Sequence, residues 1–227
     1  MNVQEENTQV IAVLTSEKIE SFQKIAIDFF RSNGRDFPWR KTKNPWKILL
    51  SEILLRKTSA IQVVQVYEEI SNLSPLELAN TPDEKLSNLL IHLGMQNERA
   101  RLLKIISRKI EESGIESLRN VSFLNSLPGV GPYARNAVLC FAYNQPLPTL
   151  DRNMIRIIDR SLSIKSAKKR PHTDRNLWKI AGLLVPIDNC KEYNWGILDL
   201  SALVCRPEKP KCDVCELNKI CDYWELK

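Results

Sequence analysis

Four cysteines near the end of this 227-residue sequence are the residues whose type and spacing most suggest chemistry. They follow the pattern C-x6-C-x2-C-x5-C, at Cys205, Cys212, Cys215 and Cys221. Four thiolates so close together repel one another, so a cationic group must hold them, either a tetrahedral zinc ion or a [4Fe-4S] cluster. Structural zinc sites usually pair cysteines in two close knuckles, and here only Cys212 and Cys215 are close. The wider outer loops favour the cluster, with zinc and unliganded thiols as the alternatives.

The segment that carries these cysteines is short and polar. Residues 206–227 are too few to pack alone, so metal binding would supply the missing folding free energy and the cluster is expected to be structural. Arg206, Lys209 and Lys211 lie in the loop between the first two cysteines. That loop is either solvated or in contact with phosphate. Cys140 and Cys190 fall outside the pattern and are expected to be buried small hydrophobic residues.

A second candidate site is the segment Leu-Pro-Gly-Val-Gly at residues 127–131, followed by a helical run from about Tyr133. Gly129 and Gly131 would let the backbone turn tightly, with Val130 in the core. The freed N–H groups would then face outward at the start of the next helix and attract a phosphate. Taken alone, the segment also fits an ordinary turn between helices.

Two carboxylates complete the set. Asp151 lies 18 residues beyond Tyr133 and directly before a helical pattern, where an aspartate is most often an N-cap. Glu52 has apolar neighbours on both sides in the segment Leu-Leu-Ser-Glu-Ile-Leu, residues 49–54, which disfavours a surface helix position.

Taken together, these features occur in one order and at one set of intervals. The sequence resembles the helix-hairpin-helix DNA glycosylases that carry an iron–sulfur cluster, the superfamily of endonuclease III and the adenine mismatch glycosylase. The resemblance lies in the hairpin at residues 127–131, in Tyr133 and Asp151, and in the four cysteines of the C-terminal tail. The resemblance runs from about Ser21 to Cys221. It implies a [4Fe-4S] cofactor and double-stranded DNA with a mismatched or damaged base as the partner.

Within that superfamily, Tyr133 stands where bifunctional members place a lysine. A lysine amine attacks the sugar C1′ and forms a Schiff base, whereas a phenol with a pKa of about 10 forms no imine. The resemblance therefore implies a monofunctional enzyme that uses water as the nucleophile and cleaves the strand little.

The segments at residues 36–40 and 45–58 resemble the mismatch glycosylases. In the adenine enzyme, the acid that matches Glu52 protonates the leaving purine. The adenine enzyme has Gln-Gln where this sequence has Arg56 and Lys57. It also continues into a further domain, whereas this sequence stops six residues after Cys221. These last two features, together with Tyr133, are similar to the thymine/uracil mismatch glycosylases known from archaea.

The resemblance implies an enzyme that flips thymine or uracil out of a pair with guanine and hydrolyses the N-glycosidic bond. Asp151 would stabilise the cationic sugar and orient or deprotonate water, while Glu52 and Tyr133 would line the base pocket. Arg56 and Lys57 would lie on a loop that enters the base stack. Backbone amides at Gly129, Val130 and Gly131 would hold a phosphate, and Arg206, Lys209 and Lys211 could contact another.

Two alternatives stay open. The first is an adenine glycosylase acting on A·G or A·8-oxoguanine pairs. The second is a non-catalytic protein that binds DNA structures through the hairpin and cluster, although a binder has no need of Glu52 and Asp151 near a polyanion.

The composition agrees with a nucleic-acid partner without identifying one. Lys and Arg number 33 against 27 Asp and Glu, a net charge of +6, and 43% of the residues are hydrophobic. No apolar stretch approaches the roughly 18 residues of a membrane span. Glu5 and Glu6 in the first fifteen residues disfavour a signal peptide. We expect a cytoplasmic, nucleoid-associated monomer.

The elements that must position these residues are predicted to be helices. Helical periodicity indicates an all-α fold with helices over residues 19–30, 48–55, 61–70, 99–110, 134–141, 153–162 and 177–185. Ser74 and Thr81 each start a capping box, and Gly34 is expected at the C′ position of the first helix. We expect a helical bundle domain with the hairpin over 35–145, and a cluster domain formed by 1–34 with 146–227. Residues 1–15 are expected to be a disordered tail.

Overall fold

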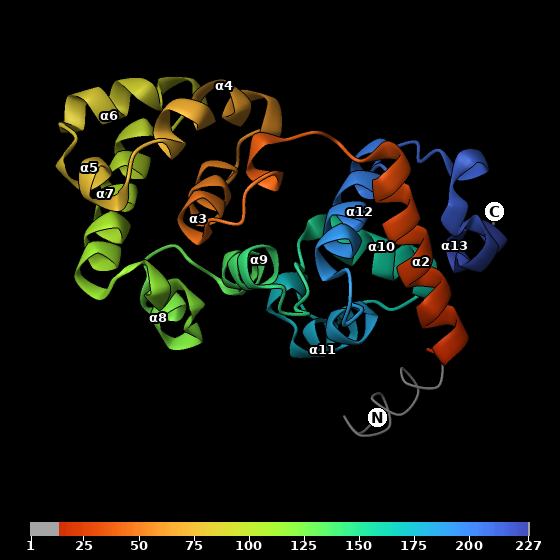
Figure 1. The fold of residues 1–227 in the computed structure, drawn as a ribbon. Helices are drawn as coiled ribbons and strands as arrows, with labels where there is room; N and C mark the ends of the chain where they lie inside the picture. Colours follow the sequence, from red (N-terminus) through yellow and green to blue (C-terminus); the bar gives the residue numbers. More distant parts are fainter. Residues whose placement is uncertain (1–13, 227) are drawn as a thin grey trace. The chain divides into compact units, whose positions relative to one another are not determined.

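The computed structural model describes residues 14–226, and every regular element within this range is a helix, with no β-strand (Figure 1). The predicted all-α class is therefore confirmed. The chain divides into two compact units: unit 1 contains the residues up to Arg35 and those from Pro146 onward, and unit 2 is Asp36–Gln145. None of the helices between residues 14 and 226 is long and apolar enough to cross a membrane.

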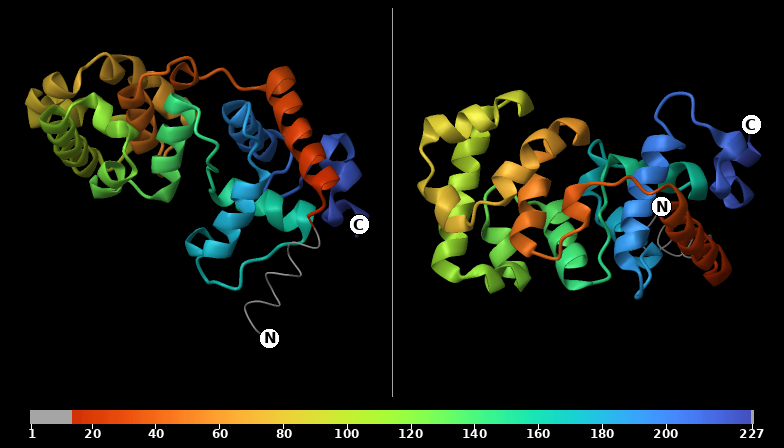
Figure 2. Two further views of the ribbon diagram at one scale, coloured as in Figure 1. Left: turned by 60° about the horizontal axis from the view of Figure 1, so that its bottom comes forward. Right: turned by 45° about the horizontal axis from the view of Figure 1, so that its top comes forward.

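Unit 1 is built around the pair of helices α2 and α12, which pack along each other (Figure 2). The ring of Phe22 in α2 lies 6.3 Å from that of Tyr193 in α12. The two backbones approach so closely at Gly196 that a Cβ atom there would lie 1.9 Å from the carbonyl oxygen of Ala26. The elements of unit 1 are α2 (Ser16–Asn33), α10 (Arg152–Leu162), η4 (Pro171–Thr173), α11 (Arg175–Leu184), α12 (Cys190–Leu203), η5 (Cys212–Val214), η6 (Glu216–Ile220) and α13 (Asp222–Glu225).

Unit 2 surrounds helix α3, in which residues 48–54 are all buried. Helix α3 packs against α9, α4 and α7, while α5 and α6 cover α7. The elements of unit 2 are η1 (Pro38–Arg40), α3 (Pro45–Leu54), α4 (Ala60–Ser71), α5 (Pro75–Asn80), α6 (Asp83–Leu89), η2 (Ile91–Leu93), α7 (Gln96–Ser113), η3 (Ile115–Arg119), α8 (Val121–Ser126) and α9 (Pro132–Tyr143).

The two predicted capping boxes have different outcomes. Ser74 forms one: its hydroxyl accepts from the Glu77 amide at 3.2 Å, and the Glu77 carboxylate accepts from the Ser74 amide at 2.7 Å. The box predicted at Thr81 is wrong, because the Thr81 hydroxyl instead donates to the carbonyl oxygen of Glu77 at 2.8 Å. Helix α6 begins at Asp83 without a side-chain cap.

Gly34 ends α2 but does not adopt the left-handed conformation expected of a C′ glycine, since its φ is −60°. The position requires glycine for a different reason: a Cβ atom there would lie 2.4 Å from the carbonyl oxygen of Phe30. Residues 1–13 of the expected disordered tail lie outside the described part of the chain. Thr15 is not part of a tail, because its hydroxyl caps α2 by accepting from the Lys18 amide.

Candidate active site

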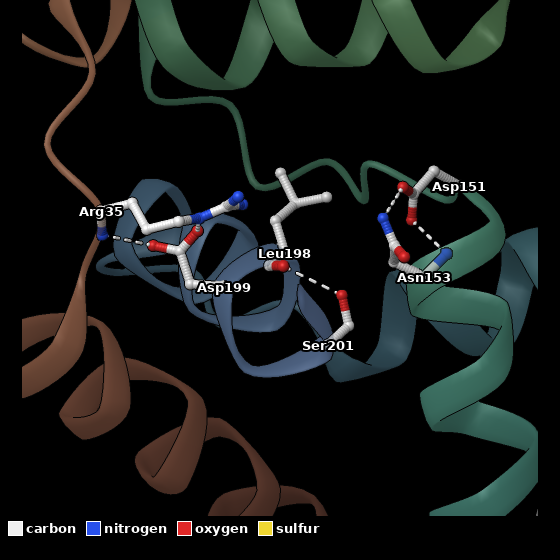
Figure 3. A network of polar contacts seen from close by, with 6 residues as sticks. All are labelled: Arg35, Asp151, Asn153, Leu198, Asp199 and Ser201. Carbon is white, nitrogen blue, oxygen red and sulfur yellow. Dashed lines mark hydrogen bonds and ion pairs between the residues drawn. The ribbon is translucent and has the colours of Figure 1, made fainter. Parts of the chain in front are cut away.

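Asp151 is the N-cap residue of α10, and three hydrogen bonds fix its carboxylate, of which Figure 3 shows the two from Asn153. Its Oδ1 accepts from the backbone amides of Asn153 and Met154, both at 2.8 Å. Its Oδ2 accepts from the side-chain amide of Asn153 at 2.7 Å. Asp151 is therefore an N-cap residue, as is most common for an aspartate at such a position. The cap uses only Oδ1, and the side-chain amide of Asn153 holds Oδ2 in place.

The environment of Asp151 opposes its ionisation. Burial raises the pKa of the carboxyl group, although the hydrogen bonds from Met154 and Asn153 and the charge of Arg156 each lower it. A carboxyl group with a raised pKa exchanges protons nearer neutral pH than a solvent-exposed aspartate does, which suits general acid–base chemistry.

Arg156, one turn further along α10, connects Asn153 to the first cysteine of the tail. Its Nη2 donates to Oδ1 of Asn153 at 3.1 Å, and its Nε donates to the carbonyl oxygen of Cys205 at 2.8 Å. Arg160, a further turn on, donates to the carbonyl oxygens of Arg206 and Pro207. Helix α10 therefore holds both Asp151 and the cysteine segment.

The four cysteines of the tail line one cavity, together with Arg160, Leu217, Tyr223 and Trp224. The pKa of the Cys215 thiol is raised to about 11, mainly by burial and in smaller part by the charges of the other three thiols. Arg160 Nη1 lies 3.5 Å from Cys205 Sγ. Four thiols that face one cavity and repel one another as thiolates fit a cationic group that takes four sulfur ligands.

Within residues 14–226, no three His, Cys, Asp or Glu side chains are grouped so as to hold a single metal ion. All six cysteines are free thiols. Cys140 and Cys190 are buried, at 0% and 2% exposed, as predicted. Arg206, Lys209 and Lys211 are exposed on the loop between the first two cysteines, and Lys209 has a left-handed backbone with φ 48°.

The hairpin between α8 and α9 lies in unit 2, and its two glycines differ. Gly129 has φ 76°, and a Cβ atom there would lie 2.7 Å from Nη1 of Arg56. Gly131 has φ −90°, and a Cβ atom there would meet nothing within 4 Å. Of the two glycines expected to let the backbone turn tightly, only Gly129 adopts a conformation that other residues avoid. Val130 is buried, as predicted.

The remaining predicted residues of unit 2 lie on α3, on α9 and in the turn after α3. Glu52 is 7% exposed in the core-facing helix α3, so it is not a surface residue. Tyr133 lies in the first turn of α9, partly exposed. Arg56 and Lys57 are exposed in the turn between α3 and α4, where Lys57 has φ 55°.

Unit 1 thus brings together Asp151, the cysteines and the basic loop, while unit 2 brings together Arg56 and the hairpin. A family model, the HhH-GPD superfamily base excision DNA repair protein, matches residues 50–182, which include Glu52, the hairpin, Tyr133 and Asp151. The chain belongs to this superfamily.

Relatives within the HhH-GPD superfamily cover more than nine-tenths of this chain. A thymine-DNA glycosylase of Aeropyrum pernix is 43% identical over 217 residues, covering 93% of this chain and 97% of that protein. A thymine/uracil-DNA glycosylase of Pyrobaculum aerophilum is 44% identical, covering 91% and 93%. The solved structure of a thermostable thymine-DNA glycosylase matches with a TM-score of 0.87 at 34% identity, covering 93% and 98%. These matches confirm the family resemblance found in the sequence.

Adenine DNA glycosylases are less similar. That of Buchnera aphidicola from Schizaphis graminum is 28% identical, covering 91% of this chain and 60% of that protein. The HhH-GPD relatives are thus DNA glycosylases in both groups.

The sequence did not predict several polar contacts within unit 1 of this HhH-GPD protein. Asn153 and Arg156 are hydrogen-bonded in series beside Asp151, and Arg35 binds Asp199 through its backbone amide and Nε at 2.8 and 2.7 Å (Figure 3). Arg156 and Arg160 are four residues apart on α10, and this basic pair was the available signal. No local sequence pattern predicts the buried position of Asp199, since its partner Arg35 is 164 residues away in the sequence.

Proposed function

We propose that this protein is a monofunctional DNA glycosylase that removes thymine or uracil from a pair with guanine. The observation that carries the proposal is the Asp151 carboxylate, fixed by Asn153 and Met154 at the start of α10 in a setting that raises its pKa. The relatives of Aeropyrum pernix and Pyrobaculum aerophilum, which cover nearly the whole chain, support the choice of base.

In the proposed reaction the bond between the sugar C1′ and the base nitrogen breaks, and its electron pair leaves with the base. Positive charge develops on the sugar, and the ionised carboxylate of Asp151 stabilises it. A water oxygen then forms the new bond to C1′ while its proton passes to Asp151, and the base takes up a proton. The products are a free pyrimidine and an abasic site in an uncut strand.

The groups of unit 2 have proposed roles in binding. Glu52, buried in α3, would contact the flipped base, and Tyr133 would pack or hydrogen-bond beside it. The exposed side chains of Arg56 and Lys57 would contact DNA where the base leaves the stack. The amides at the start of α9, after the buried Val130, would bind a phosphate. Arg206, Lys209 and Lys211 would contact a further phosphate from unit 1.

We further propose that Cys205, Cys212, Cys215 and Cys221 hold a [4Fe-4S] cluster. The single cavity that all four thiols line supports this assignment. When bound, the cluster supplies folding free energy to a polar segment and sets the shape of the loop at residues 206–211. Iron and acid-labile sulfide analysis of anaerobically purified protein tests the assignment, with Cys215→Ser expected to lose both and Cys190→Ser to keep both. Zinc in place of iron would overturn it.

The decisive experiment measures base release from duplexes that carry G·T, G·U, G·A and 8-oxoguanine·A pairs, each sampled with and without hot alkali. Strand breaks at the pyrimidine that need alkali support a monofunctional thymine/uracil enzyme. Adenine release would replace it with an adenine glycosylase. Tight binding without release of any base would replace it with a DNA-structure-binding protein.

Sedimentation of the protein bound to a mismatched duplex tests the expected monomeric state.

A further inference from the structure

Arg99, in the first turn of α7, is 5% exposed, and all three nitrogens of its guanidinium donate hydrogen bonds to backbone or hydroxyl oxygens of unit 2. These oxygens belong to the end of α3, to the turn that follows it, and to the turn before α7. Nε donates to the carbonyl oxygen of Gly94 at 2.9 Å. Nη1 donates to the carbonyl oxygens of Ile53 and Leu54 at 2.9 and 3.1 Å. Nη2 donates to the carbonyl oxygen of Arg56 and the hydroxyl of Thr58.

Both turns that Arg99 contacts have unusual backbones. Lys57 has φ 55° in the first turn, while Gly94 and Met95 have φ 70° and 53° in the second. A left-handed residue other than glycine costs free energy and persists only where its surroundings determine it. Thr58 adds to this determination, because its hydroxyl also bonds the carbonyl oxygen of Leu93 at 3.2 Å, between the two turns.

The charge of Arg99 is not neutralised by an ion pair with a carboxylate in the described part of the chain. Burial lowers the pKa of its guanidinium and the nearby charge of Arg56 lowers it further, while the charge of Glu98 raises it. The guanidinium instead lies at the C-terminus of α3, where the helix dipole and free carbonyl groups favour a cation. A buried positive charge therefore remains at the backbone carbonyl of Arg56, in the turn that carries the exposed side chains of Arg56 and Lys57.

We propose that Arg99 is a positioning residue for DNA contact, which fixes the backbone from which Arg56 and Lys57 extend and joins it to the turn at residues 94–95. This inference rests on the proposed function, in which Arg56 and Lys57 contact the DNA at the site of the flipped base. In this proposal Arg99 does not contact DNA itself but determines how accurately Arg56 and Lys57 are placed for that contact.

A double-mutant cycle tests the inference on the full chain. The variants are Arg99→Met, Lys57→Ala, their combination and Arg99→Lys, and the control is Leu103→Ala, a buried residue of the same helix. The measured quantities are the dissociation constants for G·T and matched duplexes and the single-turnover rate of base release. Helix content and thermal midpoint are recorded for every variant.

In the wild-type background Lys57→Ala should weaken binding of the G·T duplex, and in the Arg99→Met background it should change binding little. Arg99→Met alone should reduce preference for the mismatch on the order of tenfold, in keeping with the cost of small displacements. Arg99→Lys should restore part of it, because an ammonium keeps the charge but cannot bridge both turns.

Independent effects of positions 57 and 99 would overturn the inference, as would an equal loss of preference in Leu103→Ala at matched stability. If Arg99→Met does not fold, Arg99→Lys supplies the same cycle. Failure of the proposed function is a separate result: wild-type protein that prefers the G·T duplex but releases no base refutes catalysis, while the binding cycle still decides the role of Arg99.

Discussion

The guanidinium of Arg156 and the carbonyl oxygen of Cys205 are joined by a 2.8 Å hydrogen bond. Since Arg156 also reaches Asn153, and Asn153 binds Asp151, the carboxylate and the first cysteine are connected by contacts within unit 1. Arg160 donates to the carbonyl oxygens of Arg206 and Pro207 in the same loop. Within residues 14–226 it makes no hydrogen bond to Asn153.

Arg156→Met should therefore lower the rate of base release about tenfold, whereas Arg160→Met should leave that rate close to wild type. Both variants should lose roughly 2–3 kcal/mol of unfolding free energy, because each removes charged hydrogen bonds to backbone carbonyl groups. Single-turnover kinetics and denaturant unfolding measure the two effects. Equal losses of rate in the two variants would contradict the specific link to Asn153.

Asp151→Asn should reduce base release by roughly 10²–10⁴-fold while DNA binding stays close to wild type. An ionised group whose pKa burial has raised destabilises the folded state at neutral pH, so the neutral amide should also raise the unfolding free energy. The chain offers a control, since Asp174, Arg175 and Asn176 repeat the sequence of residues 151–153, and Asp174 is the N-cap residue of α11 and accepts from the Asn176 amide. Asp174→Asn should release base normally. Ordinary turnover by Asp151→Asn would refute the assignment.

Asn153→Ala should shift the acidic limb of the pH–rate profile to higher pH. The hydrogen bonds from Asn153 lower the pKa of Asp151, so removing its side-chain amide raises that pKa further. The ionised carboxylate is the active form, and it is therefore lost at a higher pH than in wild type. Single-turnover rates between pH 4 and 8 measure the limb, with Asn176→Ala as the control. An unchanged limb, or a shift to lower pH, would show that the limb does not report an Asp151 carboxylate stabilised by Asn153.

Gly129→Ala should lower the unfolding free energy by about 1–3 kcal/mol, because alanine resists φ 76° and its Cβ would displace the Arg56 side chain. Gly131→Ala should cost less than about 1 kcal/mol, since its backbone is extended and the space around it is open. Denaturant unfolding of the two variants measures the difference. Equal losses would mean that the hairpin needs both glycines after all.

Tyr133→Lys should give the protein strand-cleaving activity, because an amine at this position can attack C1′ and form a Schiff base where the phenol cannot. Borohydride trapping of a covalent protein–DNA adduct and strand breaks without alkali measure the gain. Tyr133→Phe is the control and should show neither. A lysine variant that cleaves no strand would indicate that residue 133 lies away from the sugar.

Helix periodicity and turn residues were enough to predict most helices, the buried Val130 and the N-cap at Asp151, because these depend on neighbours in sequence. Helix α12 was missed, since buried polar residues such as Asn194 and Asp199 interrupt its apolar surface and both bind distant backbone or side-chain groups. The hydrogen bonds of Arg99 were missed for the same reason, because four of its five partners lie 41 to 46 residues earlier.

The pairing of α2 with α12 also has a consequence for how the protein is made on the ribosome. Arg31 and Glu192, which form an ion pair between these helices, are 161 residues apart. At the roughly 5–20 residues per second of synthesis, the apolar side of α2 waits about 8–32 seconds for its partner. Unit 2 is translated entirely within that interval and can fold first. Slower elongation should therefore prolong the exposure of α2 to chaperones while leaving the folding of unit 2 unaffected.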